Sequence, residues 1–360
     1  MKILHIIPSL NLGGAETLVT KMAVMAKNKG CDVKILVFKK VNNHLTDLLA
    51  ANNIEVTAAS SNKNYSPSNI LFILKYLGSQ VFDVVHAHLT PAQLWVALAS
   101  LLLRKRIPLL TTEHSTHNRR RKLWFKPLDY FIYSRFAKII AVSQLTQDKL
   151  VEWLPLIKNK CQVINNGVDL KEFAIKAGNK LCQQHIAVLC VGRFYEPKGQ
   201  EYLLNALALT SGMELFLAGE GPLRSKLEQM TYKLNIADKV HFLGNRADIP
   251  NLIKAADIYV QPSLWEGLCI ATLEAMAGGL PVIASDVSAL NYVVGQTGIL
   301  FPAKDSKELA NKLMKLASDK ELRAKLALLS ITRAQDFSLS KTFQKYYNLY
   351  KNLSDTKANS

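Results

Sequence analysis

Residues 258–286 read IYVQPSLWEGLCIATLEAMAGGLPVIASD. The run IYVQPS has the length and apolar character of a buried strand, LWEGL has the composition of a loop, TLEAMAGG that of a helix, and PVIASD that of a second strand. A strand, a connecting helix and another strand in this order are typical of two parallel strands in one sheet. The stretch therefore predicts an α/β fold with a parallel sheet.

The same alternation continues in both directions. Further strand patterns are KILHIIP (2–8), DVKILVF (32–38), FDVVHAH (82–88), IPLLTTEH (107–114), AKIIAVS (137–143), IAVLCVGRF (186–194), ELFLAGEG (214–221) and VHFLG (240–244). The polar stretch 165–179 is the expected linker. We predict two Rossmann-like domains, at 1–168 and 169–340, that face each other across a cleft. A C-terminal helix and tail at 341–360 should pack back on the N-terminal domain.

Ligands of doubly wound sheets bind outside the carboxyl ends of the strands. Polar or small residues that follow strand patterns of the first half, and should share one edge, are Gly13, Gly14, His86, His88, His114 and Ser143. A histidine at a strand end is more often a hydrogen-bonded structural residue than a functional one. For His86 and His88 both interpretations stay open.

The 360-residue chain carries a net charge of +17. The excess is concentrated in residues 1–175, which hold 23 Lys and Arg against 11 Asp and Glu. A basic half favours an anionic partner, namely nucleic acid, membrane lipid or a phosphorylated substrate. The five cysteines form no Cys-x-x-Cys pair, which favours reduced thiols in a cytosolic protein over a disulfide framework or a structural zinc site.

Two further patterns concern membranes. MKILHIIPSLNLGG has one lysine before a short apolar run and no small-residue cleavage site, so we interpret it as a first strand and not as a signal peptide. The longest apolar run, LWVALASLLL at 94–103, is too short to span a bilayer and is interpreted as a buried helix.

Glu266 lies in the predicted loop of the opening stretch, and Glu274 lies about one turn into its helix. The bend between loop and helix would let both carboxylates accept hydrogen bonds from hydroxyls of one ligand, such as a sugar and a ribose. The start of the helix also suits a phosphate. The alternative is two commonplace glutamates, one near a helix start and one on the surface, and the pattern alone leaves both open.

Neighbouring motifs favour the ligand. VGRFYEPKG places Arg193 and Lys198 at a strand-to-helix turn, where two cations could neutralise a diphosphate, although exposed basic residues are common. LAGEGP (217–222) is a second glycine-rich strand end that permits a close approach of the backbone.

In this order and spacing, VGRFYEPKG, LAGEGPL, VHFLG and PSLWEGLCIATLEAMAGGLPVIASD resemble the C-terminal half of retaining glycosyltransferases of family 4, which have the GT-B fold. GGAE, TTEHS and AVSQ…INNGVD in the first half are also similar to that family. The resemblance implies that Arg193 and Lys198 stabilise a leaving diphosphate and that Glu266 contacts the donor sugar. His114 matches the strand-end histidine near the reacting sugar.

The resemblance also implies donor-binding roles. Glu274 would hold the ribose of a nucleotide sugar, backbone groups of the helix start would hold sugar and phosphate, and the loop after VHFLG would line the base. The full donor-binding set is Gly13, Gly14, Gly219, Glu220, Gly221, Leu243, Gly244, Gly267, Leu268, Cys269 and Glu274. Leu268, Cys269 and the stretch GGLP depart from the residues usual in the family. These departures leave the identity of the donor open.

Glycosyl transfer develops negative charge on the leaving diphosphate. Many transferases oppose it with Mg²⁺ held by Asp-x-Asp, a motif that does not occur in this sequence. We therefore expect the side-chain cations and the start of the helix to stabilise this charge in place of a metal ion, and we expect no metal site. We also expect no cofactor, since the nucleotide sugar is a substrate. Retention of the anomeric configuration with no assigned nucleophile suggests that the acceptor attacks the donor sugar on the face from which the diphosphate leaves.

The expected activity is a retaining hexosyl transfer, from a UDP-sugar in preference to a GDP-sugar, to a lipid-linked or oligosaccharide acceptor in surface polysaccharide synthesis. Clusters at Arg104, Lys105, Arg106 and at Arg119, Arg120, Arg121, Lys122, the latter followed by LWF, suit an anionic membrane surface. We expect a cytoplasmic protein on the inner face of the plasma membrane. A solvated basic surface is the plain alternative, and no nucleic-acid recognition motif is found.

Two other functions remain open. One is a sugar-nucleotide epimerase or phosphorylase of the same fold. The other is a non-catalytic basic protein that binds membrane or nucleic acid.

Overall fold

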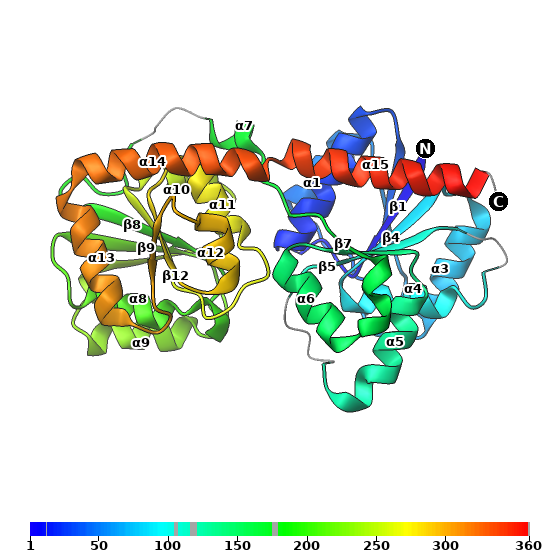
Figure 1. The fold of residues 1–360 in the computed structure, drawn as a ribbon, viewed down its shortest axis with the longest axis horizontal. Coiled ribbons are helices and arrows are strands. Elements are labelled where there is room, and N and C mark those ends of the chain that lie inside the picture. Colours follow the sequence, from blue (N-terminus) through cyan, green and yellow to red (C-terminus); the bar gives the residue numbers. More distant parts are fainter. Residues whose placement is uncertain (12, 104–106, 116–120, 175–178, 359–360) are drawn as a thin grey trace. The chain divides into compact units, whose positions relative to one another are not determined.

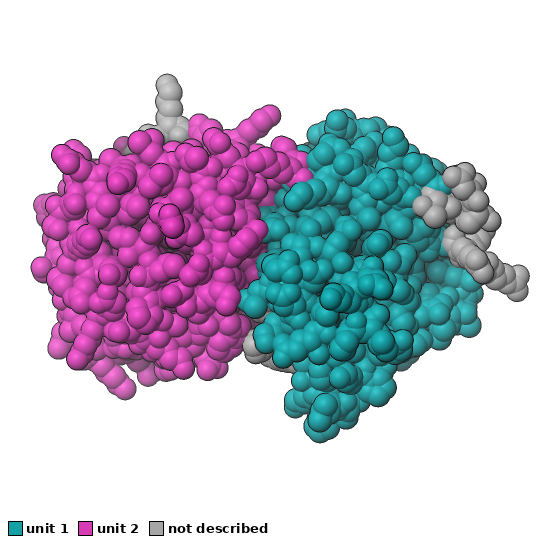
Figure 2. All heavy atoms as spheres, in the orientation of Figure 1, with its two compact units in different colours: residues 1–166, 342–360 teal, residues 167–341 magenta. Residues whose placement is uncertain are grey.

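The computed structural model describes residues 1–11, 13–103, 107–115, 121–174 and 179–358. It divides into two compact units: Met1–Asn166 together with Thr342–Ser360, and Gly167–Lys341 (Figure 2). The first unit thus ends two residues before the sequence-based boundary and takes in the end of the chain.

A seven-stranded parallel sheet forms the centre of the first unit, in the order β3-β2-β1-β4-β5-β6-β7 (Figure 1). Its strands are β1 (Lys2–Ile7), β2 (Asp32–Val37), β3 (Glu55–Ala58), β4 (Val84–His88), β5 (Leu109–Glu113), β6 (Lys138–Ala141) and β7 (Cys161–Val163). Its α-helices are α1 (Gly14–Asn28), α2 (His44–Ala51), α3 (Ser68–Ser79), α4 (Leu89–Ala99), α5 (Lys126–Ser134), α6 (Gln144–Trp153) and most of α15 (Leu339–Ala358).

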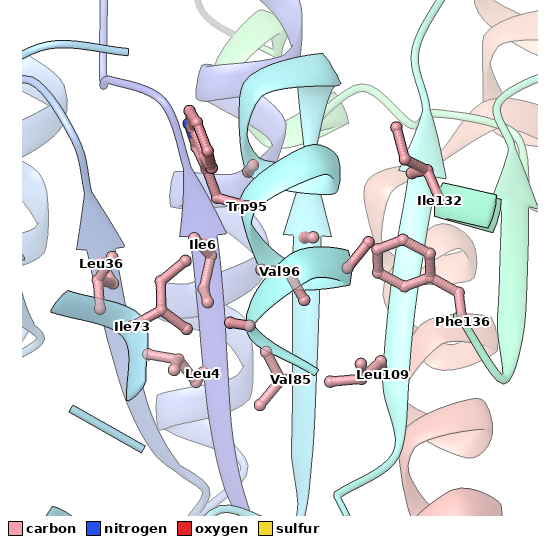
Figure 3. Packing of buried hydrophobic residues seen from close by; sticks show 14 of the residues in the cluster. Leu4, Ile6, Leu36, Ile73, Val85, Trp95, Val96, Leu109, Ile132 and Phe136 are labelled. Carbon is pink, nitrogen blue, oxygen red and sulfur yellow. The ribbon is translucent and has the colours of Figure 1, made fainter. Parts of the chain in front are cut away.

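Side chains of successive residues in β1 point to opposite faces of this sheet. Leu4 and Ile6 join a buried cluster with Val85 of β4 and with Trp95 and Val96 of α4, as Figure 3 shows. Because neighbouring residues of a strand point to opposite faces, His5 points away from this cluster. Its ring lies 6.2 Å from that of Tyr350 in α15.

The C-terminal helix α15 is held on the first unit by two buried tyrosines. Tyr350 Oη lies 2.7 Å from His86 Nδ1, and Tyr346 Oη lies 3.1 Å from Thr112 Oγ1. Both side chains are almost fully buried. The helix thus covers the strands that carry His5 and His86.

The second unit is built on a six-stranded parallel sheet in the order β10-β9-β8-β11-β12-β13. The strands are β8 (Ile186–Val191), β9 (Met213–Ala218), β10 (Val240–Gly244), β11 (Ile258–Gln261), β12 (Val282–Ser285) and β13 (Ile299–Phe301). The helices are α7 (Leu170–Phe173), α8 (Gln200–Leu207), α9 (Arg224–Lys233), α10 (Ile249–Ala255), α11 (Ile270–Ala277), α12 (Ser288–Val294), α13 (Ser306–Ser318) and α14 (Lys320–Ala334). One buried cluster joins the strands to α8 and α13.

The prediction of two Rossmann-like parallel-sheet domains is confirmed. Three strands that the sequence patterns did not indicate, β3, β7 and β13, lie at sheet edges. The apolar run 94–103 is only in part a buried helix, because α4 ends at Ala99 and the side chains of Leu101 and Leu102 are 55% and 65% exposed.

Candidate active site

The candidate residues of the second unit follow four adjacent strands, β10, β9, β8 and β11. Since these strands are parallel, the loops after them lie at the same edge of the sheet. The loop after β8 carries Arg193 and Lys198, and the loop after β11 carries Glu266. Residues 219–221 follow β9, and Leu243 and Gly244 end β10. The sheet topology therefore gathers these sequence-predicted residues at one edge.

Lys198 and Glu266 form the central ion pair of this edge. Lys198 Nζ lies 2.6 Å from Glu266 Oε1, and the two side chains are only 22% and 11% exposed. Burial by itself lowers the pKa of Lys198, but the Glu266 carboxylate more than offsets this and the net pKa is raised. Lys198 therefore keeps its positive charge in a partly desolvated place, where a cation acts strongly on a bound anion.

A chain of buried side chains positions Glu266. Tyr259 Oη donates to Gln261 Oε1 at 2.7 Å, Gln261 Nε2 donates to Ser263 Oγ at 2.7 Å, and Ser263 Oγ donates to Glu266 Oε1 at 2.8 Å. The first three side chains are fully buried. Sequence reasoning missed their role. The signal was the polar residues inside the apolar pattern YVQPS, since buried polar groups are retained where they are paired.

Two glycines allow the loops to approach each other. Gly199 has φ +63°, and a Cβ there would lie 2.2 Å from the carbonyl oxygen of Pro262. Gly219 has φ +149°, and a Cβ there would lie 2.1 Å from the carbonyl oxygen of Gly192. A side chain at either position would push neighbouring loops apart.

Arg193 and the glycine-rich loop after β9 have contacts of their own. Arg193 is exposed, and its guanidinium carbon lies 5.3 Å from the centre of the Tyr195 ring. Glu220 forms an ion pair with Arg224 in α9, so its carboxylate is engaged within the protein. The backbone of Gly219 donates to the carbonyl of Gly244 at 2.8 Å, which joins the loops after β9 and β10.

Helix α11 begins directly after the loop that holds Glu266. Gly267 and Glu274 are half-buried, whereas Leu268 and Cys269 are 7% and 3% exposed. Burial, and after it the charge of Glu266, raises the pKa of Cys269 to about 12. The thiol is thus protonated near neutral pH and is a poor nucleophile. That a donor binds at the start of α11 stays a prediction.

A series of hydrogen-bonded histidines in the first unit runs from His5 within β1 to His88 at the end of β4 and to His114 after β5. His5 Nδ1 lies 3.0 Å from His88 Nε2, and His88 Nδ1 lies 3.3 Å from His114 Nε2. Burial lowers the pKa of both His5 and His114 to about 4, so these rings are neutral at physiological pH. His114 Nδ1 is buried without a hydrogen-bond partner among the described residues. Sequence reasoning did not single out His5, which lies in an otherwise apolar strand.

The two histidines left open by the sequence have different surroundings. His86 is held at both ring nitrogens, by Tyr350 at 2.7 Å and by Thr112 Oγ1 at 2.8 Å, which is a structural arrangement. His88 instead positions His114. Gly13 and Gly14 lie at the start of α1, where a Cβ on Gly13 would lie 2.5 Å from Glu16 Oε2.

The basic clusters are described only in part. Arg104, Lys105, Arg106, Arg119 and Arg120 lie outside the described residues. Beyond them, Lys122 Nζ lies 5.3 Å from the Trp124 ring, and the side chains of Leu123 and Trp124 are 80% and 73% exposed. Among the described helices, none has the length and apolarity needed to cross a bilayer.

Two groups of side chains in the described residues have the composition and spacing of metal ligands. One is His5, His86 and His88 in the first unit, and the other is Cys182, His185 and Glu214 in the second. Neither belongs to the loops that carry Lys198 and Glu266.

The two Rossmann-like parallel-sheet units have the architecture of the GT-B fold. Residues 12–172 match the family described as Glycosyltransferase Family 4, and residues 172–328 match Glycosyl transferases group 1. The chain therefore belongs to the family 4 glycosyltransferases, as its sequence motifs predict.

Individual relatives agree with this assignment. The UDP-Gal:alpha-D-GlcNAc-diphosphoundecaprenol alpha-1,3-galactosyltransferase of Escherichia coli is 26% identical, over 97% of this chain and 96% of its own. The uncharacterized glycosyltransferase MJ1178 of Methanocaldococcus jannaschii is 30% identical over 77% of each chain. The fold of Anabaena Alr3699/HepE, solved with UDP-glucose, matches with a TM-score of 0.85 at 24% identity, over 98% of this chain and 100% of that one.

Proposed function

We propose that the chain transfers a hexose, with retention of anomeric configuration and without a metal ion, from a UDP-sugar to a lipid-linked or oligosaccharide acceptor in surface polysaccharide synthesis. The observation that carries the proposal is the ion pair of Lys198 with Glu266, held between the loops after β8 and β11. In the complex, the diphosphate of the donor takes Lys198 as its counter-ion, and Glu266 turns to hydroxyls of the donor sugar.

The charge at this edge fits the demands of the reaction. As the glycosidic bond breaks, negative charge grows on the diphosphate, and cations already in place stabilise that charge without reorganisation. Lys198 is held for this role by Glu266, and the exposed Arg193 can move onto the outer phosphate. The start of α11 adds backbone N–H groups of Gly267, Leu268 and Cys269.

Further contacts fix the two substrates. Glu274, half-buried in α11, accepts hydrogen bonds from the ribose hydroxyls. Neutral His114, with its buried Nδ1 unpartnered among the described side chains, lies near the reacting sugar and bonds a hydroxyl there. Gly13 and Gly14 let the backbone at the start of α1 come close to the donor phosphates.

The proposed donor and acceptor draw on the relatives. The printed name of the Escherichia coli relative contains both a UDP-sugar and a diphospholipid-linked sugar, and the Anabaena structure holds UDP-glucose. The net charge of +17 and the exposed Leu123 and Trp124 suit an anionic lipid surface. We therefore place the protein in the cytoplasm, peripherally on the inner face of the plasma membrane.

The test is a donor screen followed by product analysis. The full chain is first screened by thermal shift against UDP-, GDP- and ADP-sugars in the presence of EDTA, where a bound donor raises the melting temperature. The stabilising donor is then incubated with a diphospholipid-linked sugar, and the anomeric configuration of the product is determined by NMR. We expect a UDP-sugar to give the largest shift and the product to retain the donor's configuration.

The variants Lys198→Ala, Arg193→Ala and Glu274→Ala separate this proposal from its alternatives. All three should lose transfer, and wild-type rates in all three would refute the assignment of the site. Epimerisation without an acceptor, or phosphate-dependent release of a sugar phosphate, would identify an epimerase or a phosphorylase instead. Vesicle or RNA binding with no affinity for any nucleotide sugar would identify a non-catalytic binding protein.

A further inference from the structure

A cluster of polar side chains lies at the opposite edge of the second sheet from the donor loops. His185 immediately precedes β8, Cys182 lies three residues before His185, and Glu214 is the second residue of β9. Cys182 Sγ and His185 Nδ1 each lie 2.9 Å from Glu214 Oε1. The donor loops follow the other ends of the same strands. Six residues of β8 at about 3.3 Å each put the cluster on the order of 20 Å away.

We propose that Cys182, His185 and Glu214 bind a single Zn²⁺ ion. A thiolate, an imidazole and a carboxylate are the ligand types that zinc takes in proteins, and three protein ligands leave a fourth position for water. The potential ligand atoms all lie within 4.8 Å of one another. Zinc–ligand bonds of about 2.0–2.3 Å place tetrahedral ligands about 3.3–3.6 Å apart. Cys182 Sγ and His185 Nδ1, each 2.9 Å from Glu214 Oε1, would each need to move away from that oxygen by about 0.4–0.7 Å to reach this spacing.

The surroundings of the three side chains hold them in place for a metal. His241 Nε2 lies 2.7 Å from the other carboxylate oxygen of Glu214, and the His241 ring stacks on Phe216 with centroids 4.6 Å apart. The backbone N–H of His185 donates to Cys182 Sγ at 3.4 Å, which helps to orient the sulfur. Such outer partners orient metal ligands and tune their affinity.

The binding step balances by the loss of protons. The Glu214 carboxylate already accepts hydrogen bonds from Cys182, His185 and His241, which fix its orientation as a ligand. Zn²⁺ displaces the proton of the Cys182 thiol, which passes to solvent, and takes a lone pair from a ring nitrogen of His185. Cys182 and Glu214 are half-buried and His185 is exposed, so the ion can enter from solvent.

The other candidate group is poorly suited to a metal. His86 uses both ring nitrogens for Tyr350 and Thr112, and His88 uses both for His5 and His114. All three rings of that group are fully buried, which makes the entry of an ion costly. The proposal also revises the expectation of no structural zinc. That expectation rested on the absence of a Cys-x-x-Cys pair, whereas here a Cys-x-x-His pair finds its third ligand on β9.

The experiment is a titration of the metal-free full chain, freed of any affinity tag, with Co²⁺ and then with Zn²⁺. A thiolate bound to Co²⁺ absorbs in the near ultraviolet, so the spectrum reports ligation by cysteine directly. We expect the absorption to saturate at one equivalent and to disappear on addition of Zn²⁺. Cys182→Ser should abolish it, and His185→Ala should weaken Co²⁺ binding at least about tenfold.

Matched controls are Cys161→Ser, a half-buried cysteine of the first unit, and His44→Ala, an exposed histidine. Both should bind Co²⁺ like the wild type. His185 is exposed, so its variant tests the site even if Cys182→Ser does not fold. An absent thiolate band, or one that survives in Cys182→Ser and His185→Ala, would overturn the proposal. The readout is independent of donor turnover, so it stands or falls separately from the proposed transferase reaction.

Discussion

The two units share one architecture, a parallel sheet covered by helices, but the polar side chains on their sheets differ in charge. The second unit has an ion pair, and the first unit has neutral histidines. In the second unit, Lys198 and Glu266 form an ion pair 2.6 Å apart and are mostly buried. In the first unit, His5, His88 and His114 form a hydrogen-bonded series in which burial holds the rings neutral. The difference is that Lys198 has a carboxylate that offsets the cost of its burial.

This contrast corresponds to what each half of a transferase has to bind. A donor diphosphate needs fixed cations, whereas a sugar hydroxyl needs neutral donors and acceptors at fixed positions. A buried imidazolium would repel the cation-like sugar that forms during transfer.

The largest effect is expected from Lys198→Ala. Removing the charge that opposes the leaving diphosphate should lower kcat for a UDP-sugar by about 10²–10³-fold, the usual cost of losing one preorganised group. Steady-state kinetics in EDTA measure it. Lys226→Ala is the matched control, because Lys226 is also paired with a glutamate but lies on α9 and is 62% exposed. Equal kcat values for the two variants would remove Lys198 from the mechanism.

Glu274→Ala should act on binding more than on the chemical step. Hydrogen bonds to a charged group are worth about 1.5–3 kcal/mol, so the Kd of UDP should rise by roughly 10–100-fold. Isothermal titration calorimetry gives this directly. Glu228→Ala, on α9, should leave the Kd unchanged. An unchanged Kd in Glu274→Ala would mean that the ribose is held elsewhere.

The buried, neutral histidines of the first unit make the free energy of unfolding depend on pH. His5 and His114 have folded-state pKa values of about 4, well below 6.5. Between pH 6.5 and 4 the unfolded chain therefore binds more protons than the folded chain, and the free energy of unfolding falls as the pH falls. Each histidine contributes up to about 1.4 kcal/mol per pH unit.

Urea denaturation at a series of pH values checks this dependence. His5→Gln should flatten the slope between pH 6.5 and 4, and the exposed His44→Ala should not change it. A slope that His5→Gln leaves as steep as in the wild type would show that another group titrates in this window.

The smallest effect is expected at the surface. Trp124→Ser removes an exposed aromatic ring beside Lys122 and should weaken binding to anionic vesicles by about five- to tenfold. Transfer to a water-soluble acceptor should not change. Sedimentation with phosphatidylglycerol vesicles measures the first quantity. Tyr232→Ser, 72% exposed on the second unit, is the control, and equal binding by both variants would argue against a membrane surface at Trp124.

The central strands and the edge strand β10 were predictable from sequence, and the edge strands β3, β7 and β13 were not. The strand β1 buries five of its six residues, so its apolar run stands out. By contrast, β3 and β7 consist of exposed or half-buried residues, and β13 has three residues of which one is buried. An edge strand has one neighbour and little burial, so its sequence carries a weak pattern.

Site residues that belong to sequence motifs were predictable. Residues that only position another site residue were not. Lys198 and Glu266 lie in recognisable loops, although 68 residues separate them. Gln261 and Ser263, which position Glu266, have no signature beyond their polarity within a strand pattern. His5 was hidden in the same way, because only the sheet register, which pairs it with His86, brings it to the histidines of β4.

The most direct test of the central claim compares the binding of UDP and uridine in EDTA. If Lys198 is the counter-ion of the diphosphate, UDP should bind the wild type about 100-fold more tightly than uridine, and Lys198→Ala should lower that ratio by about tenfold or more while uridine binds as before. An unchanged ratio in Lys198→Ala would contradict the account.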